Sequence, residues 1–190
     1  MCNLYSHTSN IEAIRAPART FNDLAGNLAP QTGIYSDYPA PIMRTDADGV
    51  RELAMARWGM PGPAAATGTP VTNFCNLASR HWQRWTGQAH SCLVPFTSFS
   101  DYMPTPNPAT KRKDVAWSAL DETRPLASFA GLWSTWNGIR GIKANPVIGL
   151  HDLFGFLTCE PNAVVKPIHH KAMPVILTTA AERDVWLRAS

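Results

Sequence analysis

Short runs of aromatic and β-branched residues recur along most of the chain, and proline and glycine residues separate them. Runs of this kind favour strands, because branched and aromatic side chains pack well on a pleated surface. The pattern predicts strands at residues 2–5, 42–44, 50–58, 92–96, 115–120, 126–133, 154–158 and 174–177. The chain is therefore expected to be mainly β, with helical additions.

Helical signals are clearest near the two ends of the chain. The segment SNIEAI predicts a short packing helix, with Ser9 or Asn10 as its N-cap and two isoleucines one turn apart. Thr179 and Glu182 form a capping-box pattern before an apolar run at residues 185–187. We expect this last helix to close the core.

Two stretches rich in proline and glycine are expected to be loops. Residues 16–41 predict an extended loop that leads into a strand, and residues 59–70 predict a surface loop rather than a linker between domains. A chain of 190 residues lies within the usual size of one domain. We therefore expect a single compact domain over residues 1–190.

Composition and charge narrow the class of protein only slightly. Charged residues make up 16% of the chain and hydrophobic residues 45%, which describes a globular protein whose surface is less ionic than average. A formal net charge of +3 permits binding to a polyanion without requiring it. The first residues have no signal-peptide pattern, and no apolar stretch is long enough to span a membrane. We expect a soluble, cytoplasmic protein.

Cysteine spacing and motif searches exclude several classes of enzyme. Cys2, Cys75, Cys92 and Cys159 lie far apart without CxxC pairs, which argues against a zinc site and a disulfide scaffold. The chain has no GxSxG, Walker, GxGxxG or HExxH motif. Reduced thiols are expected, with neither a metal nor a cofactor.

Cys2 gains a distinctive chemistry if Met1 is removed, because its α-amine and thiol then form a 1,2-aminothiol. An amine with a pKa of about 7.7 to 8.0 is partly neutral near pH 7 and attacks aldehydes. The thiol can then close on the imine to give a thiazolidine, and a ring-opened abasic deoxyribose is such an aldehyde. By itself the dipeptide is a weak signal, since a Cys after the initiator Met usually has no special role.

Residues 72–85 mix amides, arginines and tryptophans, as segments that hold single-stranded nucleic acid do. The alternative is equally weighted: Trp82 and Trp85, three apart on a helix, would pack in the core while Arg80 and Arg84 face solvent. The cluster of Lys and Arg at residues 111–113 is either a DNA contact or, more often for such runs, a solvated loop.

Two further groups suit proton transfer. One imidazole of His169 and His170 can sit at a strand entrance, where a histidine titrates near neutrality. Asp101 is either a general acid/base or a turn residue that bonds its own backbone. For the histidine pair a structural role is the commoner alternative.

Several motifs taken together are more specific than any of these residues alone. Cys2 directly after Met1, the TNFCN segment, SCLVPFTSFSDY, FAGLW and FLTCEPNAVVKPIHHKAMPVIL occur in an order that resembles the SOS response associated peptidase (SRAP) family. The similarity runs from residue 2 to about residue 177. Its most specific part is the closing IHHKAMPVIL.

The resemblance implies both a fold and a function. Members are single α+β domains, so we expect mostly antiparallel, twisted β-sheets with a barrel-like core and flanking helices. They bind single-stranded DNA and crosslink to abasic sites as a thiazolidine through the N-terminal Cys, which shields the lesion during the DNA damage response. Autocatalytic removal of Met1 and a lyase activity are also ascribed to the family. We expect a monomer that is cytoplasmic and associated with the nucleoid.

The resemblance also implies roles for single residues. Cys2 matches the nucleophile, and Asn73 matches the amide that holds the N-terminus or the sugar. Asp101 stands where the family usually has Glu, which activates Cys2 and assists removal of Met1. His169 matches the family histidine, with His170 as the alternative. The residues expected to contact DNA are Asn76, Arg80, Arg84, Trp85, Tyr102, Thr158 and Lys171.

The chain departs from the family pattern at two places that bear on DNA affinity. The usual Cys-Gly-Arg start is Cys2-Asn3-Leu4 here, and the Asn-x-Arg pattern ends in Cys75. Two arginines expected near phosphates are therefore absent, and we expect the basic residues above to compensate. Two alternatives stay open: a non-covalent module that binds single strands, and a cysteine peptidase that acts on other proteins through Cys2 and His169.

Overall fold

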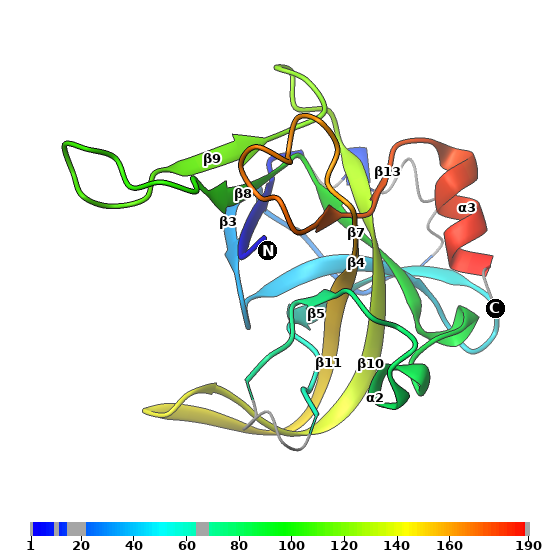
Figure 1. Ribbon diagram of the computed structural model, residues 1–190. Coiled ribbons are helices and arrows are strands. Elements are labelled where there is room, and N and C mark those ends of the chain that lie inside the picture. Colours follow the sequence, from blue (N-terminus) through cyan, green and yellow to red (C-terminus); the bar gives the residue numbers. More distant parts are fainter. Residues whose placement is uncertain (1, 10–11, 15–21, 64–68, 189–190) are drawn as a thin grey trace.

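Five strands of the computed structural model close into a barrel (Figure 1). The structure describes residues 2–9, 12–14, 22–63 and 69–188. The barrel strands are β4 (Pro39–Thr45), β5 (Arg51–Trp58), β7 (Ser91–Phe96), β10 (Ala127–Ile142) and β11 (Asn145–Cys159). Neighbours in the order β11-β10-β7-β4-β5 pair antiparallel, and a parallel pairing of β11 with β5 closes the ring.

A second sheet carries the N-terminal strand. Its antiparallel order is β3 (Gln31–Tyr35), β1 (Leu4–His7), β8 (Ser98–Tyr102) and β9 (Val115–Ser118). β1 is a central strand of this sheet, and Tyr5 on it is fully buried against the rings of Trp58, Phe129 and Phe156. The N-terminal segment is therefore anchored in the barrel core.

Aromatic rings fill the barrel and explain why these segments form strands. The rings of Phe96 and Phe129 stack at 3.8 Å, and Phe156 lies 4.6 Å from Phe129 and 5.2 Å from Trp58. Aromatic pairs of this kind add stability beyond the area that they bury. The predicted β class and barrel-like core are confirmed.

Short elements complete the chain around the barrel. They are β2 (Asn22–Asp23), β6 (Asn73–Phe74), α2 (Arg80–Gln83), the 3₁₀ helix η2 (Gln88–His90), β12 (Met173–Pro174), β13 (Ile176–Leu177) and α3 (Ala180–Arg188). The predicted capping box is confirmed, because Glu182 donates its N–H to Thr179 Oγ1 and accepts the Thr179 N–H at 2.8 Å. Trp186 donates its indole N–H to Cys92 O, so α3 closes over the barrel.

Three predictions of local structure were wrong in extent. The expected loop at residues 16–41 contains β2, β3 and the start of β4. The expected strands at 126–133 and 154–158 are parts of β10 and β11, which continue as a hairpin beyond the barrel. There Ile139 is exposed and Arg140 is buried, so hydrophobicity does not follow burial and the sequence pattern does not mark the strand. Of the first predicted helix, residues 12–14 are helical and Ile14 is buried, whereas Asn10 and Ile11 lie outside the described residues.

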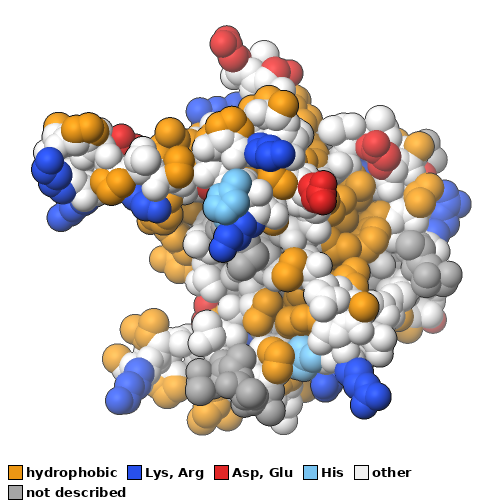
Figure 2. Space-filling view, in the orientation of Figure 1, with side chains coloured by type: hydrophobic (Ala, Val, Ile, Leu, Met, Phe, Trp, Pro, Cys, Tyr) orange, Lys and Arg blue, Asp and Glu red, His pale blue; other side chains and the backbone are white. Residues whose placement is uncertain are grey.

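Two hairpins project from the same side of the molecule, at the left of Figures 1 and 2. One is the end of β10 and β11, which stay paired from Gly131↔Phe156 to Ile142↔Asn145. The other is the connection between β8 and β9, residues 103–114. Within the described residues, no helix is long and apolar enough to cross a membrane.

Candidate functional site

Cys2 immediately precedes the central strand β1, which brings it to the end of the barrel. Its side chain is 2% exposed and belongs to the same buried cluster as Tyr5, Trp58 and Val165. The thiol donates to Leu4 O at 3.3 Å. Burial raises the pKa of the Cys2 thiol to about 12, and the nearby charge of Asp101 raises it further. At neutral pH the sulfur is therefore a protonated thiol.

Asn73 holds the backbone of Cys2. Its short strand β6 pairs in parallel with β11, at Phe156↔Asn73, which carries the amide to the barrel end. The Asn73 amide donates to Cys2 O at 3.0 Å and to Thr72 Oγ1 at 2.8 Å. Asn73 Oδ1 is buried and has no hydrogen-bond partner within the part of the chain that the structure describes. A buried acceptor without a donor is costly, so it favours a donor at this position.

Asp101 reaches the site from the neighbouring strand. The register Leu4↔Ser100 between β1 and β8 places Asp101 beside the start of β1. Asp101 also lines a cavity of about 240 Å³ between β1, β3, β8 and β9. The cavity wall consists of Asn3, Leu4, Tyr35, Ser100, Asp101, Tyr102 and Val115. Asp101, whose charge acts on the Cys2 thiol, thus lines a cavity that begins at Asn3, the residue after Cys2.

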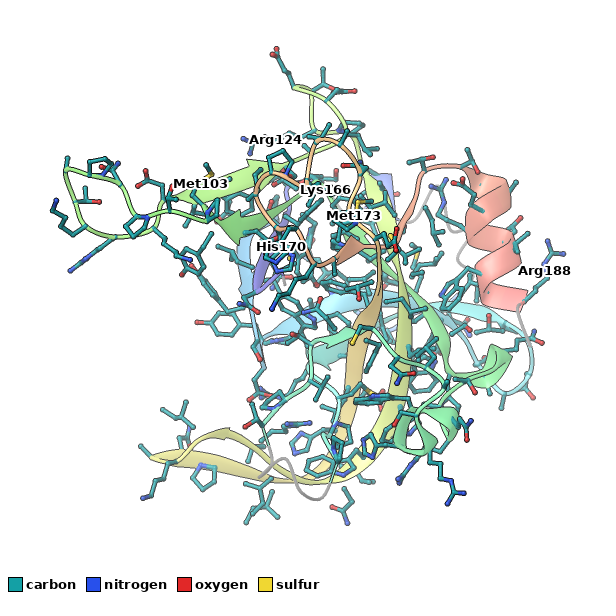
Figure 3. All side chains as sticks on the ribbon, in the orientation of Figure 1. Met103, Arg124, Lys166, His170, Met173 and Arg188 are labelled. Atoms are coloured by element: carbon teal, nitrogen blue, oxygen red, sulfur yellow. The ribbon has the colours of Figure 1, made fainter. Side chains whose placement is uncertain are left out.

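His169 lies in the loop between β11 and β12. Its Nδ1 is 2.8 Å from Ala172 O, and its backbone N–H donates to Val165 O at 2.8 Å. These contacts fix the orientation of the ring, and Val165 packs in the cluster that contains Cys2. His170 is exposed on the same loop, with Lys166 and Met173 nearby (Figure 3). Of the two imidazoles, His169 is the half-buried one.

Comparison with known proteins identifies the family. A family model described as SOS response associated peptidase (SRAP) matches residues 1–190. The chain belongs to the SRAP family. This SRAP chain is 27% identical over 140 residues to the abasic site processing protein YobE of Bacillus subtilis (strain 168). The match covers 71% of this chain and 58% of YobE, so it spans little more than half of that relative.

Solved structures share the fold of this SRAP chain. A protein from Bordetella bronchiseptica is 21% identical with a TM-score of 0.70, over 98% of this chain and 88% of that one. A protein from Bacteroides thetaiotaomicron is 22% identical with a TM-score of 0.72, over 100% of this chain and 82% of that one. At these identities the likeness concerns the fold alone. It confirms the predicted fold class.

The residues predicted to contact DNA fall on separate parts of the SRAP fold. Thr158 donates to Phe74 O at 3.1 Å, next to Asn73, and Tyr102 lies at the cavity with 60% of its surface exposed. Lys171 is exposed on the loop that carries His169. These positions surround the end of the barrel at which Cys2 lies.

The other predicted contacts lie around α2. Arg80 and Arg84 are exposed, and Asn76 Oδ1 accepts the Ala78 N–H at 3.1 Å. Trp85 is only 8% exposed, packs against the Trp82 ring at 5.7 Å and carries the Arg84 guanidinium 4.9 Å from its centroid. Burial leaves this indole little surface on which a base can stack. The packing alternative therefore describes the tryptophans, with the arginines facing solvent.

Sequence reasoning missed part of the cavity wall. Tyr35 and Val115 are 50% and 46% exposed and line the cavity opposite Asp101. Tyr35 falls in the segment expected to be a loop, so no strand pattern drew attention to it. Among the described residues, no group of three or more His, Cys, Asp or Glu is arranged to hold a metal ion.

Proposed function

We propose that this SRAP protein captures abasic sites in single-stranded DNA by forming a thiazolidine with Cys2 after removal of Met1. The observation that carries the proposal is the position of Cys2 at the end of the barrel. The Asn73 amide holds it there by a hydrogen bond to the Cys2 carbonyl oxygen. The name of YobE, an abasic site processing protein, supports abasic DNA as the substrate. The family description supports a role in the DNA damage response.

The reaction needs two bonds to the aldehyde carbon of the ring-opened sugar. The α-amine of Cys2 attacks this carbon first, and the carbinolamine loses water to form an imine. The sulfur then adds to the imine carbon, and the thiol proton ends on the nitrogen. The sum is one aldehyde and one aminothiol converted to a thiazolidine and one water.

The raised pKa of the Cys2 thiol suits this order of steps. A protonated thiol in a buried site does not compete with the amine for the aldehyde. The thiol gives its proton to the imine nitrogen as the sulfur adds to the imine carbon. Because Asp101 interacts electrostatically with the thiol, we assign to it the proton transfers at Cys2.

Asn73 and His169 complete the assignment. Asn73 Oδ1 is the buried acceptor that an α-amine at Cys2 would satisfy, so we assign to Asn73 the orientation of the amine. His169, whose ring is fixed by Ala172, is assigned the protonation of the carbinolamine oxygen that leaves as water. Removal of Met1 must precede capture, since the α-amine exists only afterwards.

Non-covalent binding of single strands is a second candidate function. The observation that favours it is the 2% exposure of Cys2, which keeps the sulfur away from solvent. In that case the exposed cations alone would hold DNA. Binding would then weaken steeply with salt and survive loss of the thiol.

Denaturing electrophoresis with abasic single-stranded DNA distinguishes the two functions. The wild type and Cys2→Ala are compared, with Cys75→Ala as the matched control because Cys75 is exposed. Intact-mass measurement first establishes that Met1 is absent. A band that survives denaturation for the wild type and Cys75→Ala, but not for Cys2→Ala, is the expected result. If no variant gives such a band although each binds the DNA, capture is rejected in favour of non-covalent binding.

A further inference from the structure

The hairpin between β8 and β9 carries the most concentrated positive charge of the chain. Residues 103–114, here called the basic arm, contain three cations and one carboxylate, a net charge of +2 against +3 for the whole chain. Lys111, Arg112 and Lys113 are all exposed. Figure 2 shows blue side chains at the tip of this arm, well away from the barrel.

The tip of the basic arm is an ordered structure. Asn107 Oδ1 accepts the Ala109 N–H at 2.9 Å, and the Asn107 backbone bonds to Arg112 O and to the Lys111 N–H. Asn107 Nδ2 donates to Asp114 at 2.8 Å, so the one carboxylate of the arm serves the turn. No ion pair between described residues involves the three cations. The turn therefore holds them in place without neutralising them.

The backbone of Lys111 adopts an energetically unfavourable conformation in the turn of the basic arm. Its φ is 58°, in the left-handed region that residues other than glycine seldom occupy. Such backbone strain persists only where the surroundings impose it, and it clusters at sites of function.

The base of the basic arm is part of the site itself. Asp101 and Tyr102 pair with Ala116 and Val115 across β8 and β9, and Tyr102 and Val115 line the cavity beside Asp101. Tyr102 and Asn107 are five positions apart, and at no more than about 3.3 Å per residue the distance between them is at most roughly 16 Å. Stacked nucleotides advance about 3.4 Å along one strand, and an unstacked single strand advances further per nucleotide. The tip thus lies within about five nucleotides of the cavity.

We propose that the basic arm binds the phosphates of the DNA strand within about five nucleotides to one side of the captured lesion. The inference rests on the proposed function for the location of the lesion. It assigns Lys111, Arg112 and Lys113 to backbone contacts, which give affinity without base specificity. These contacts take the place of the arginines that this chain lacks after Cys2 and after Asn73.

Affinity for DNA of different lengths tests the proposal. The probe is a single strand with a tetrahydrofuran abasic analogue, which has no aldehyde and measures binding alone. Flanks of about twelve nucleotides reach the arm, whereas flanks of about one nucleotide do not. The test variant replaces Lys111, Arg112 and Lys113 with Ala. The control replaces Arg124, Lys143 and Arg188, which are also exposed and carry the same total charge.

For the long probe, the arm variant is expected to bind roughly tenfold more weakly than the wild type at moderate salt. Its slope of log affinity against log salt falls by about 2, since each single-strand phosphate contact contributes about 0.7. The wild type and the arm variant are expected to bind the short probe equally. When the long flank is present on only one side of the lesion, the difference in affinity is expected for one strand polarity and not for the other.

An unchanged affinity of the arm variant overturns the proposal. So does an equal loss with the short probe or in the control, since either result means non-specific attraction to charge. Crosslinking to an aldehyde-containing strand is measured separately. If the wild type fails to crosslink, the proposed capture fails while the affinity comparison still tests the arm.

Discussion

The end of the barrel at Cys2 and the two projecting hairpins are built in opposite ways. Around Cys2 the side chains are buried, and Asn73 fixes the backbone by a hydrogen bond. On the hairpins, Ile148 and Leu150 are 76% and 74% exposed, and the basic arm ends in solvent. A covalent reaction needs groups held in one geometry, whereas contact with a long polymer needs reach. The contrast predicts that mutations in the two regions change different measurable quantities.

The two hairpins also differ from each other. Ile139 and Ile148 face each other on the β10–β11 hairpin, where the exposed side chains are largely aliphatic. The basic arm carries three adjacent cations instead. The β10–β11 hairpin carries one exposed cation, Lys143, and the buried Arg140, whereas the three cations of the basic arm are adjacent and all exposed. The proposed backbone contact is therefore assigned to the basic arm.

The largest expected effect is on stability. Phe156→Ala removes a fully buried ring that contacts the rings of Trp58 and Phe129, and should lower the free energy of unfolding by about 3–5 kcal/mol. Ile148→Ala on the hairpin should change it by no more than about 0.5 kcal/mol. Urea denaturation followed by tryptophan fluorescence measures both. Equal losses would mean that the hairpin is part of the cooperative core.

Thiol reactivity should separate the buried and exposed cysteines. A pKa of about 12 for Cys2, against an ordinary value of 9.0, lowers its thiolate fraction roughly 1000-fold near pH 8, since each unit is a factor of ten. Because the pKa is raised, reactivity should appear only as the pH rises towards that value. Peptide mass spectrometry after iodoacetamide treatment should therefore find Cys75 modified first. Comparable rates at Cys2 and Cys75 would show an accessible, activated thiolate instead.

Asn73 offers a smaller but more specific effect on the proposed capture. Asn73→Ala removes the hydrogen bond to Cys2 O, so the aminothiol loses its orientation and the rate of crosslinking should fall by about 10-fold to 100-fold. Asn137→Ala is the control, because Asn137 is exposed on β10 and belongs to none of the predicted contacts with DNA. Single-turnover rates at saturating DNA measure the effect. An unchanged rate in Asn73→Ala would remove this residue from the site.

The sequence predicted those features that depend on residues close together in the chain. The Thr179 and Glu182 capping box depends on residues three apart, and the motifs around Cys2 and Asn73 carry the family resemblance that the family model confirms. The cavity wall was not predictable in this way. It exists because Leu4 lies opposite both Ser100 and Tyr35, a pairing of three strands distant in sequence.

Exposure explains the remaining differences between prediction and structure. Along the end of β10, exposed and less exposed positions still alternate, but Ile139 is exposed and Arg140 is buried, so the hydrophobic alternation that marks a strand is lost. The tryptophans of residues 72–85 illustrate the reverse case. Trp82 and Trp85 fit base stacking and core packing equally well by sequence, and only their burial distinguishes the two.

The smallest expected effect concerns pH and compares the buried His7 with the exposed His170. Gln31 donates to Pro39 O, which directs its Oε1 to His7 Nε2 at 2.9 Å, so the neutral ring carries its proton on Nε2. His7 Nδ1 is buried without a partner among the described residues, and burial lowers the pKa of His7. Stability is then complete above the unfolded pKa of about 6.5 and decreases as the pH falls from there towards the lower folded pKa. Urea midpoints of the wild type should fall between pH 7.5 and 5.5, and His7→Gln should flatten that fall while His170→Gln leaves it unchanged. A fall that persists in His7→Gln would assign the acid sensitivity to other groups.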